Sequence, residues 1–472
     1  MIGRKAEIQK IELLLASERS EFLAVTGRRR VGKTFLIDVL LRERYCFNLT
    51  GIQNGTLQQQ LANFAIKLSE YNGTYTPVIP QNWQMAFLQL KAYLVKLPKD
   101  KKQIVFIDEL PWVATPRSNF IQFLAHFWND YLSKEKHFLL VICGSATSWI
   151  SQKIINDRGG LHNRVTEIIH LHPFTLAETK TFFDSKHIRL TFQEIAKIYM
   201  TLGGIPFYLE NIRKGESFAS AIERICFSPN GLLRNEYQNL YQALFNNYDV
   251  HQSIVALLAT RQNGLTRPEI FEHFNIKSSG SYTRALKELQ ISDFVDEKIP
   301  FIGRNKGVYF RLIDEYSIFY HRFIKTNRQY TKGLWQQLSS SQTYKIWLGF
   351  AFENLCHKHI DEIKVTLGIA AVYTEIYSLR VPKSKENEGF QIDLIIDRKD
   401  DSINLCEIKF YATEFTISKS YYDELLRKKQ AFIDHSSTKK QIFITLITNH
   451  GVKKNQYANE IVDAEVRLEE LM

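Results

Sequence analysis

The chain has 472 residues, of which 44% are hydrophobic and 24% are charged. These values are typical of folded globular proteins, and the length is too great for one hydrophobic core. The net charge of +11 is compatible with a polyanionic partner but does not establish one. From the charged first residues we expect no signal peptide, and from the lack of a long apolar run we expect no membrane-spanning helix. Five scattered cysteines favour a reducing compartment. We therefore expect a cytoplasmic protein of several domains with no membrane partner.

A phosphate-binding motif lies at residues 27–34. The sequence Gly-Arg-Arg-Arg-Val-Gly-Lys-Thr follows an apolar run of strand length and precedes an amphipathic helix. This is the G-x-x-x-x-G-K-[ST] loop in the strand-then-helix context that supports the assignment. Its glycines let backbone N–H groups surround phosphate oxygens, and the helix N-terminus favours negative charge. The sequence therefore predicts an ATP site.

Within this loop, Lys33 is expected to contact the β- and γ-phosphates, and the Thr34 hydroxyl is expected to ligate Mg²⁺. The other predicted nucleotide-binding positions are the remaining loop residues and the residue that follows them, namely Gly27, Arg28, Arg29, Arg30, Val31, Gly32 and Phe35.

Two carboxylates follow the apolar run at residues 104–107. Continuously apolar strands are typical of buried parallel sheets, where ligands bind at the carboxyl ends of the strands. Asp108 is therefore predicted to hold Mg²⁺, and Glu109 to polarise the attacking water as a catalytic residue. The alternative is an acidic loop after a core strand.

Another apolar segment, residues 138–143, precedes Ser145, whose hydroxyl can contact the γ-phosphate or serve only as a helix N-cap. The next loop contains Arg158 and Arg164. We favour Arg164 as a catalytic arginine finger, in its own subunit or in a neighbouring one, which leaves a homo-oligomer open. The alternative is a solvated arginine.

Residues 175–226 have a helical pattern that is interrupted by Gly-Gly-Ile-Pro at 203–206. This break suits either a small helical lid over the nucleotide or an ordinary turn between helices. We therefore assign residues 1–174 to the ATPase core and residues 175–245 to the lid.

Residues 1–230 resemble the archaeal-type ATPases, a branch of P-loop ATPases related to the AAA+ and STAND groups. The resemblance rests on motifs in a common order: Gly3-Arg4 with Glu7, the phosphate-binding loop, Ile-Asp-Glu at 107–109, Gly-Ser at 144–145, the Arg164 loop, and Gly-Gly-Ile-Pro-Phe-Tyr-Leu at 203–209. It implies an ATP-binding α/β core with a helical lid. It also implies nucleotide roles for Lys33, Thr34, Asp108 and Glu109.

Residues 246–328 have the pattern of a winged helix-turn-helix. Thr266 is expected to cap one helix, residues 280–290 are expected to form the recognition helix, and strand-like segments flank a basic loop. The side chains of the recognition helix expected to face outward are Ser281, Tyr282, Arg284 and Lys287. The cations that favour DNA binding are Arg284, Lys287, Arg304 and Lys306. The alternative is a domain that makes intramolecular or protein contacts.

A linker is expected at 329–345 and a last domain at 346–472. Glu353 lies in an apolar helix, and two strand-like segments flank a turn at 398–402. A hairpin centred near Asp400 places Asp393 opposite Glu407, with Lys409 on the same face. Carboxylates opposed at about 5 Å repel unless a cation lies between them.

Oxygen ligands of this kind suit Mg²⁺ or Mn²⁺, and Lys409 can orient or activate the attacking water, so the set suits phosphodiester hydrolysis. Residues 347–450 resemble the restriction-endonuclease-like core, PD-(D/E)XK, through the metal ligands Glu353, Asp393 and Glu407 and the catalytic Lys409. Gln430 matches an accessory position. The usual proline is missing, since Gln391 and Ile392 precede Asp393.

The combined prediction is an α/β protein: a parallel-sheet P-loop ATPase core with a helical lid, a winged helix, and a restriction-endonuclease-like domain. Its expected function is ATP hydrolysis that controls a DNA-associated winged helix and a Mg²⁺-dependent nuclease domain, with DNA as the partner. The alternative is a STAND-like regulatory switch whose catalytically inactive tail binds a protein.

Overall fold

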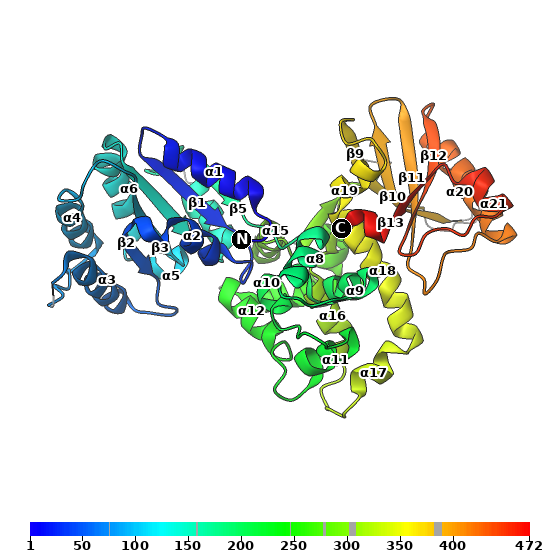
Figure 1. Ribbon diagram of the computed structural model, residues 1–472, viewed down its shortest axis with the longest axis horizontal. Coiled ribbons are helices and arrows are strands. Elements are labelled where there is room, and N and C mark those ends of the chain that lie inside the picture. The colour runs from blue at the N-terminus through cyan, green and yellow to red at the C-terminus, as the bar shows by residue number, and fades with distance from the viewer. Residues whose placement is uncertain (75, 157–158, 246, 277–279, 302–307, 382–388) are drawn as a thin grey trace. The chain divides into compact units, whose positions relative to one another are not determined.

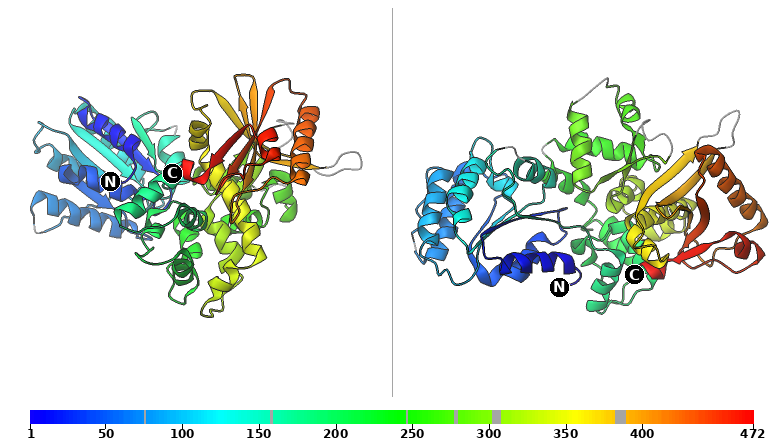
Figure 2. Two further views of the ribbon diagram at one scale, coloured as in Figure 1. Left: turned by 45° about the vertical axis from the view of Figure 1, so that its right-hand side comes forward. Right: turned by 90° about the horizontal axis from the view of Figure 1, so that it is seen from above.

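The computed structural model describes residues 1–74, 76–156, 159–245, 247–276, 280–301, 308–381 and 389–472. The chain divides into two compact units (Figures 1 and 2). The first contains Met1–Pro173 and Ala243–Asn246, and the second contains Phe174–Gln242 and Asn247–Met472. None of the described helices combines the length and the apolar character that crossing a bilayer requires.

The first unit is built on a parallel sheet with the strand order β2-β3-β4-β1-β5. The strands are β1 (Glu21–Thr26), β2 (Tyr45–Thr50), β3 (Gln103–Asp108), β4 (Phe138–Cys143) and β5 (Glu167–His170). The helices are α1 (Lys5–Ala16), α2 (Lys33–Leu41), α3 (Leu57–Asn72), α4 (Trp83–Leu94), α5 (Leu110–Val113), α6 (Phe120–Asp130) and α7 (Thr147–Ile150). The predicted α/β core with a parallel sheet is confirmed.

Helices cover both faces of this sheet, which explains why its central strands are continuously apolar. Every residue of β1 and β4 is buried. One face packs against α3, α4 and α6 through a core that includes Phe64, Trp83 and Phe127. Helices α1 and α2 lie on the opposite face (Figure 1). Strands buried on both sides form the rigid base from which the loops at their carboxyl ends project.

The second unit begins with short helices: α8 (Leu176–Ser185), α9 (Phe192–Leu202), α10 (Pro206–Leu209), α11 (Phe218–Ile222) and α12 (Glu236–Leu244). Next come α13 (Tyr248–Ala259), β6 (Leu265–Thr266), α14 (Arg267–His273), α15 (Gly280–Ile291), β7 (Val295–Lys298), β8 (Tyr309–Leu312) and α16 (Glu315–Phe319). Strands β6, β8 and β7 form a small antiparallel sheet. As expected, Thr266 caps α14, and it shares a capping box with Glu269.

The segment at 329–345, predicted as a linker, contains helical structure. Residues Leu334–Ser339 form helix α17, and the next helix, α18, already begins at Gln342. The Trp335 side chain on α17 is 0% exposed and stacks against Phe227 at a centroid distance of 5.4 Å. Burial of a tryptophan outweighs the turn-forming tendency of the serine-rich sequence that follows it.

The C-terminal residues form a mixed sheet with the order β13-β12-β11-β10-β9, antiparallel from β9 to β11 and parallel from β11 to β13. The strands are β9 (Thr374–Val381), β10 (Phe390–Arg398), β11 (Ser402–Lys409), β12 (Gln441–Thr448) and β13 (Ala464–Arg467). The helices are α18 (Gln342–Lys358), α19 (Ile360–Thr366), α20 (Lys419–Ser436) and α21 (Gln456–Ile461).

Candidate nucleotide and metal sites

The phosphate-binding loop connects the end of β1 at Thr26 to the start of α2 at Lys33. Gly27 and Gly32 have φ angles of 134° and 92°, a region that side chains disfavour. A Cβ atom on Gly27 would also lie 3.2 Å from the Leu171 nitrogen and would clash with the Leu171 carbonyl oxygen. Both the backbone conformation and the available space therefore require glycine at Gly27.

The Lys33 side chain is 5% exposed, and its ammonium group lies inside the loop. Its Nζ donates to the carbonyl oxygens of Gly27 at 2.9 Å and Arg28 at 2.7 Å. It also donates to Ser145 Oγ at 3.2 Å. Burial lowers the pKa of Lys33, and the carboxylates of Glu109 and Asp108 oppose that shift. The cation is thus held where a phosphate could exchange for these neutral acceptors.

Asp108 lies at the carboxyl end of β3, where it accepts a hydrogen bond from Thr34 Oγ1 at 3.0 Å. Burial and the neighbouring Glu109 raise the pKa of Asp108, while the bond from Thr34 opposes the rise. A hydroxyl and a carboxylate oxygen side by side are donors of the type that Mg²⁺ prefers. The pair therefore fits the magnesium position predicted from the sequence.

Ser145 connects the remaining predicted residues of this site. Its backbone N–H donates to Glu109 Oε2 at 3.2 Å and its hydroxyl donates to Glu109 Oε1 at 2.9 Å. Since the same hydroxyl accepts from Lys33, one residue links the phosphate-binding cation to the proposed water-polarising carboxylate.

The contact between Arg4 and the phosphate-binding loop was not predicted from the sequence. The Arg4 guanidinium donates to the Val31 carbonyl at 3.3 Å.

Other predicted positions lie at the edge of this site or outside it. Arg28 and Val31 are buried and Arg29 and Arg30 are half-buried, whereas the Phe35 side chain is 63% exposed on α2. Arg164 is exposed in a turn after residue 159. Among the described residues, no hydrogen bond or ion pair joins its side chain to the phosphate-binding loop. Arg158 lies outside the described residues.

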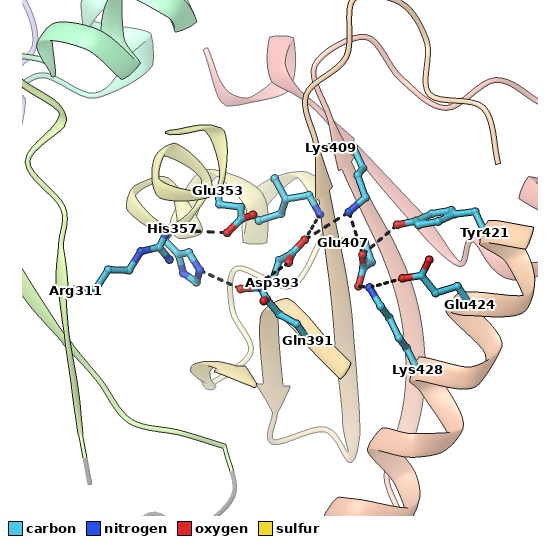
Figure 3. A network of polar contacts seen from close by, with 11 residues as sticks. Arg311, Glu353, His357, Gln391, Asp393, Glu407, Lys409, Tyr421, Glu424 and Lys428 are labelled. Carbon is cyan, nitrogen blue, oxygen red and sulfur yellow. Dashed lines mark hydrogen bonds and ion pairs between the residues drawn. The ribbon is translucent and has the colours of Figure 1, made fainter. Parts of the chain in front are cut away.

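A second constellation lies in the C-terminal sheet (Figure 3). The β10–β11 register pairs Leu394 with Cys406, so the next position outward places Asp393 opposite Glu407, as the hairpin argument expects. Asp393 Oδ2 accepts from the Ile408 N–H at 3.0 Å. Lys409 Nζ lies 3.1 Å from Glu407 Oε2 and 3.8 Å from Asp393 Oδ2.

The surroundings shift the pKa values of the carboxylates in this constellation in different directions. Burial raises the pKa of Glu353 to about 8, and the charge of Asp393 adds to the rise. Burial and Glu407 also raise the pKa of Asp393. Burial acts in the same direction on Glu407, but Lys409 and Lys428 outweigh it and hold the pKa of Glu407 below its ordinary value. Mutual repulsion among buried carboxylates is the condition that a divalent cation relieves.

Several polar neighbours of these carboxylates were not predicted. Lys428 Nζ on α20 lies 2.9 Å from Glu407 Oε1, and Tyr421 Oη donates to Glu407 Oε2 at 3.0 Å. Arg311 on β8 lies 4.0 Å from Glu353 Oε2. The predicted accessory residue Gln430 is wrong, because its exposed side chain donates to Asp434 at 2.8 Å instead. Lys428 occupies the place beside the site, two positions earlier on the same helix.

The exposed face of α15 is basic. Ser281, Arg284 and Lys287 are exposed, as expected for residues that face outward. Tyr282 is an exception, since it is half-buried and its ring lies 5.0 Å from that of Phe274. Arg304 and Lys306 lie outside the described residues.

Residues 1–212 match the family model described as an ATPase domain predominantly from Archaea. An uncharacterized protein of Methanocaldococcus jannaschii is 24% identical over 437 residues, which cover 91% of this chain and 92% of the relative. An uncharacterized ATP-binding protein of the same organism is 27% identical over 207 residues, or 41% of this chain and 55% of the relative. The fold is similar to that of a Walker-type ATPase of Pyrococcus abyssi, with a TM-score of 0.50, 19% identity, and coverage of 68% of this chain and 96% of the other.

Proposed function

We propose that the archaeal-type P-loop ATPase domain in residues 1–212 hydrolyses ATP with Mg²⁺. ATP hydrolysis would control DNA cleavage by the C-terminal domain, residues 346–472, which we call the tail. The nuclease activity is proposed because two buried carboxylates, Asp393 and Glu407, lie side by side. The Lys409 ammonium is within 4 Å of both. A set of this kind suits metal-assisted phosphodiester hydrolysis.

In the ATPase half, Lys33 and the N–H groups at the start of α2 would bind the phosphates, and Thr34 and Asp108 would hold Mg²⁺. Glu109 would orient the attacking water. Ser145 supports this assignment because it bonds to both Lys33 and Glu109. Arg164 is proposed as a finger that stabilises charge, within one subunit or across a homo-oligomer.

In the tail, Glu353, Asp393 and Glu407 would hold Mg²⁺, which supplies Lewis-acid activation of the scissile phosphate. The carboxylates that surround Lys409 outweigh its burial and raise the pKa of Lys409, so this side chain carries its proton. Lys409 would therefore hold the attacking water and stabilise negative charge on the phosphate rather than accept a proton.

The domain assignments that go with this function are a helical lid at 175–245, a DNA-binding winged helix at 246–328 and a nuclease fold at 346–472. The order of α13, α14 and α15 followed by the antiparallel pair β7 and β8 supports the winged helix. The cations exposed on α15 support a DNA contact.

Cleavage of DNA tests the nuclease proposal. Purified protein with plasmid or linear DNA, ATP and Mg²⁺ or Mn²⁺ is expected to produce cuts that EDTA abolishes. Asp393→Asn should reduce the rate by about 100-fold, because a neutral amide is a weaker metal ligand. The control is Asp397→Asn on the same strand, where Asp397 pairs with Lys440 at 2.6 Å rather than with the site. Equal cutting by wild type and Asp393→Asn would reject the proposal.

DNA binding by α15 is tested separately. Replacing Arg284 and Lys287 together by alanine is expected to weaken duplex binding and to lower the slope of log K against log salt by about 1.8, since each phosphate contact contributes about 0.9. Fluorescence anisotropy across a salt series measures both quantities. An unchanged slope would show that α15 does not contact phosphates.

A regulatory switch without nuclease activity is the second candidate, and the charge balance of the tail favours it. Glu353 faces Arg311, Asp393 faces Lys409, and Glu407 faces Lys428. Carboxylates compensated in this way can be stable without a metal. Under this alternative, Mn²⁺ binding would not differ between wild type and Asp393→Asn, and neither protein would cut DNA, while Lys33→Ala would still abolish ATP turnover.

A further inference from the structure

The second unit contains a cavity of about 1040 Å³ that extends to the carboxylates of the tail. One wall comes from the loop after α13 and from β8, with Arg261, Tyr309 and Arg311. The other wall comes from β9, β10 and α18, with Arg380, Asp393 and Glu353. Two regions far apart in sequence therefore face the same space, and the proposed metal ligands lie in its wall.

Cations and acids both line this cavity, and Glu272 on α14 is an exposed acid among them. The observation that favours a polyanion is the pairing state of two arginines. Arg261 and Arg380 are exposed on different walls, and neither forms an ion pair with any residue the structure describes. By contrast, Lys298 in the same lining is paired with Asp296 at 2.8 Å. Glu269 lies on α14, which also lines the cavity. Its carboxylate takes part in the N-terminal cap of α14, where it accepts a hydrogen bond from the Thr266 N–H at 2.7 Å. The two arginines thus remain available to phosphate groups.

The size and the aromatic content of the cavity indicate which polyanion fits. Its volume is close to the largest of the pockets that enclose small ligands, which span about 300–1,000 Å³, and is too little for a double helix. The Tyr309 side chain is 38% exposed in the lining. Unpaired arginines beside an exposed aromatic ring suit a single strand, because cations follow the backbone and bases stack on rings.

Arg311 connects the cavity to the carboxylates. It lies 4.0 Å from Glu353, at the outer limit of an ion pair (Figure 3). The segment that follows Arg311 is also tied to α18, the helix that carries Glu353. Asn354 Nδ2 donates to the Ile313 carbonyl at 3.3 Å, and Lys358 Nζ donates to Glu315 Oε1 at 2.6 Å. These contacts fix β8 against α18, so the guanidinium is held beside Glu353 with donors to spare.

We infer that this cavity binds a single strand of nucleic acid, whose backbone Arg261 and Arg380 hold and whose phosphodiester group reaches Arg311 beside Glu353. The inference deepens the proposed nuclease function by assigning it a single-stranded substrate. Arg261 and Arg380 are positioning residues, because they act on the backbone rather than on the reacting atoms.

Binding tests the inference without relying on cleavage. The probe is a fluorescent oligothymidylate, measured by anisotropy in EDTA with the full chain. Arg261→Ala combined with Arg380→Ala is expected to lower affinity at least tenfold and to reduce the salt slope by about 1.4, since each contact to a single strand contributes about 0.7. The matched control is Arg189→Ala with Lys439→Ala, which removes the same charge from exposed positions that do not line the cavity.

The result that overturns the inference is equal affinity of the cavity variant and the control variant for the oligothymidylate. Single-stranded RNA of the same length distinguishes the source of the strand, and equal loss of RNA and DNA binding supports a site that recognises the shared backbone. If Asp393→Asn binds the oligothymidylate normally and wild type does not cut DNA, the nuclease proposal fails while the binding groove stands.

Discussion

Replacing Lys33 by alanine is expected to lower the ATP turnover rate by at least about 100-fold, comparable with the loss of one preorganised charge-stabilising donor. The Lys33 ammonium is buried inside the loop and donates to Gly27, Arg28 and Ser145, so the alanine variant loses the cation at the centre of the loop. Phosphate release at saturating ATP and Mg²⁺ measures the rate, and binding of a fluorescent ATP analogue measures affinity.

Two further variants make this experiment specific. Lys91→Ala removes an exposed lysine of the same unit, paired with Asp130 at 3.1 Å, and should leave turnover unchanged. Glu109→Gln should retain nucleotide binding while losing hydrolysis, because the amide keeps a hydrogen-bond acceptor for Ser145 but polarises water poorly. If Lys33→Ala turned over ATP within a few-fold of wild type, hydrolysis could not be assigned to this loop.

The same variant tests the coupling between the two halves of the proposed function. If nucleotide state controls the tail, Lys33→Ala should change the rate of DNA cleavage although Lys33 itself lies in the first unit. An unchanged cleavage rate would mean that the ATPase and the tail act independently. Asp393→Asn should in turn leave ATP turnover intact, which separates control from catalysis.

Sequence reasoning succeeded where a local pattern determines local geometry. The glycines of the loop at 27–34 and the apolar strands before Asp108 and Ser145 specify a short path from a buried strand to the polar residues at its carboxyl end. In the tail, the two-residue period of a strand and the turn near Asp400 fix the register, so Asp393 faces Glu407.

Contacts that depend on tertiary packing could not be predicted from the sequence. Arg311 and Lys428 reach the tail carboxylates from β8 and α20, and no spacing in the sequence connects them to Glu353 or Glu407. Adjacent lysines on α20 look equivalent in the sequence, and only the orientation of the helix on the sheet selects Lys428. Trp335 gave a signal that could have been used, because a tryptophan in a short polar segment usually requires a buried site.

Gly204→Ala is expected to destabilise the second unit by more than about 3 kcal/mol or to prevent its folding. A Cβ atom there would lie 2.8 Å from the backbone N and C atoms of Phe174 and would clash with the Phe174 carbonyl oxygen. The Phe174 N–H also donates to the Gly204 carbonyl at 2.7 Å, so the two backbone segments cannot separate without losing that bond. Urea unfolding followed by circular dichroism, together with soluble yield, measures the effect.

The matched control is Gly349→Ala, in the interior of helix α18 with open space around its Cα atom. Alanine there should be neutral or stabilise the helix by up to about 1 kcal/mol, because it favours the helix more than glycine does. A Gly204→Ala protein with wild-type stability would contradict the close backbone contact. If the variant is destabilised but still binds an ATP analogue, the Gly-Gly-Ile-Pro segment is required for packing of the second unit rather than for contact with the nucleotide.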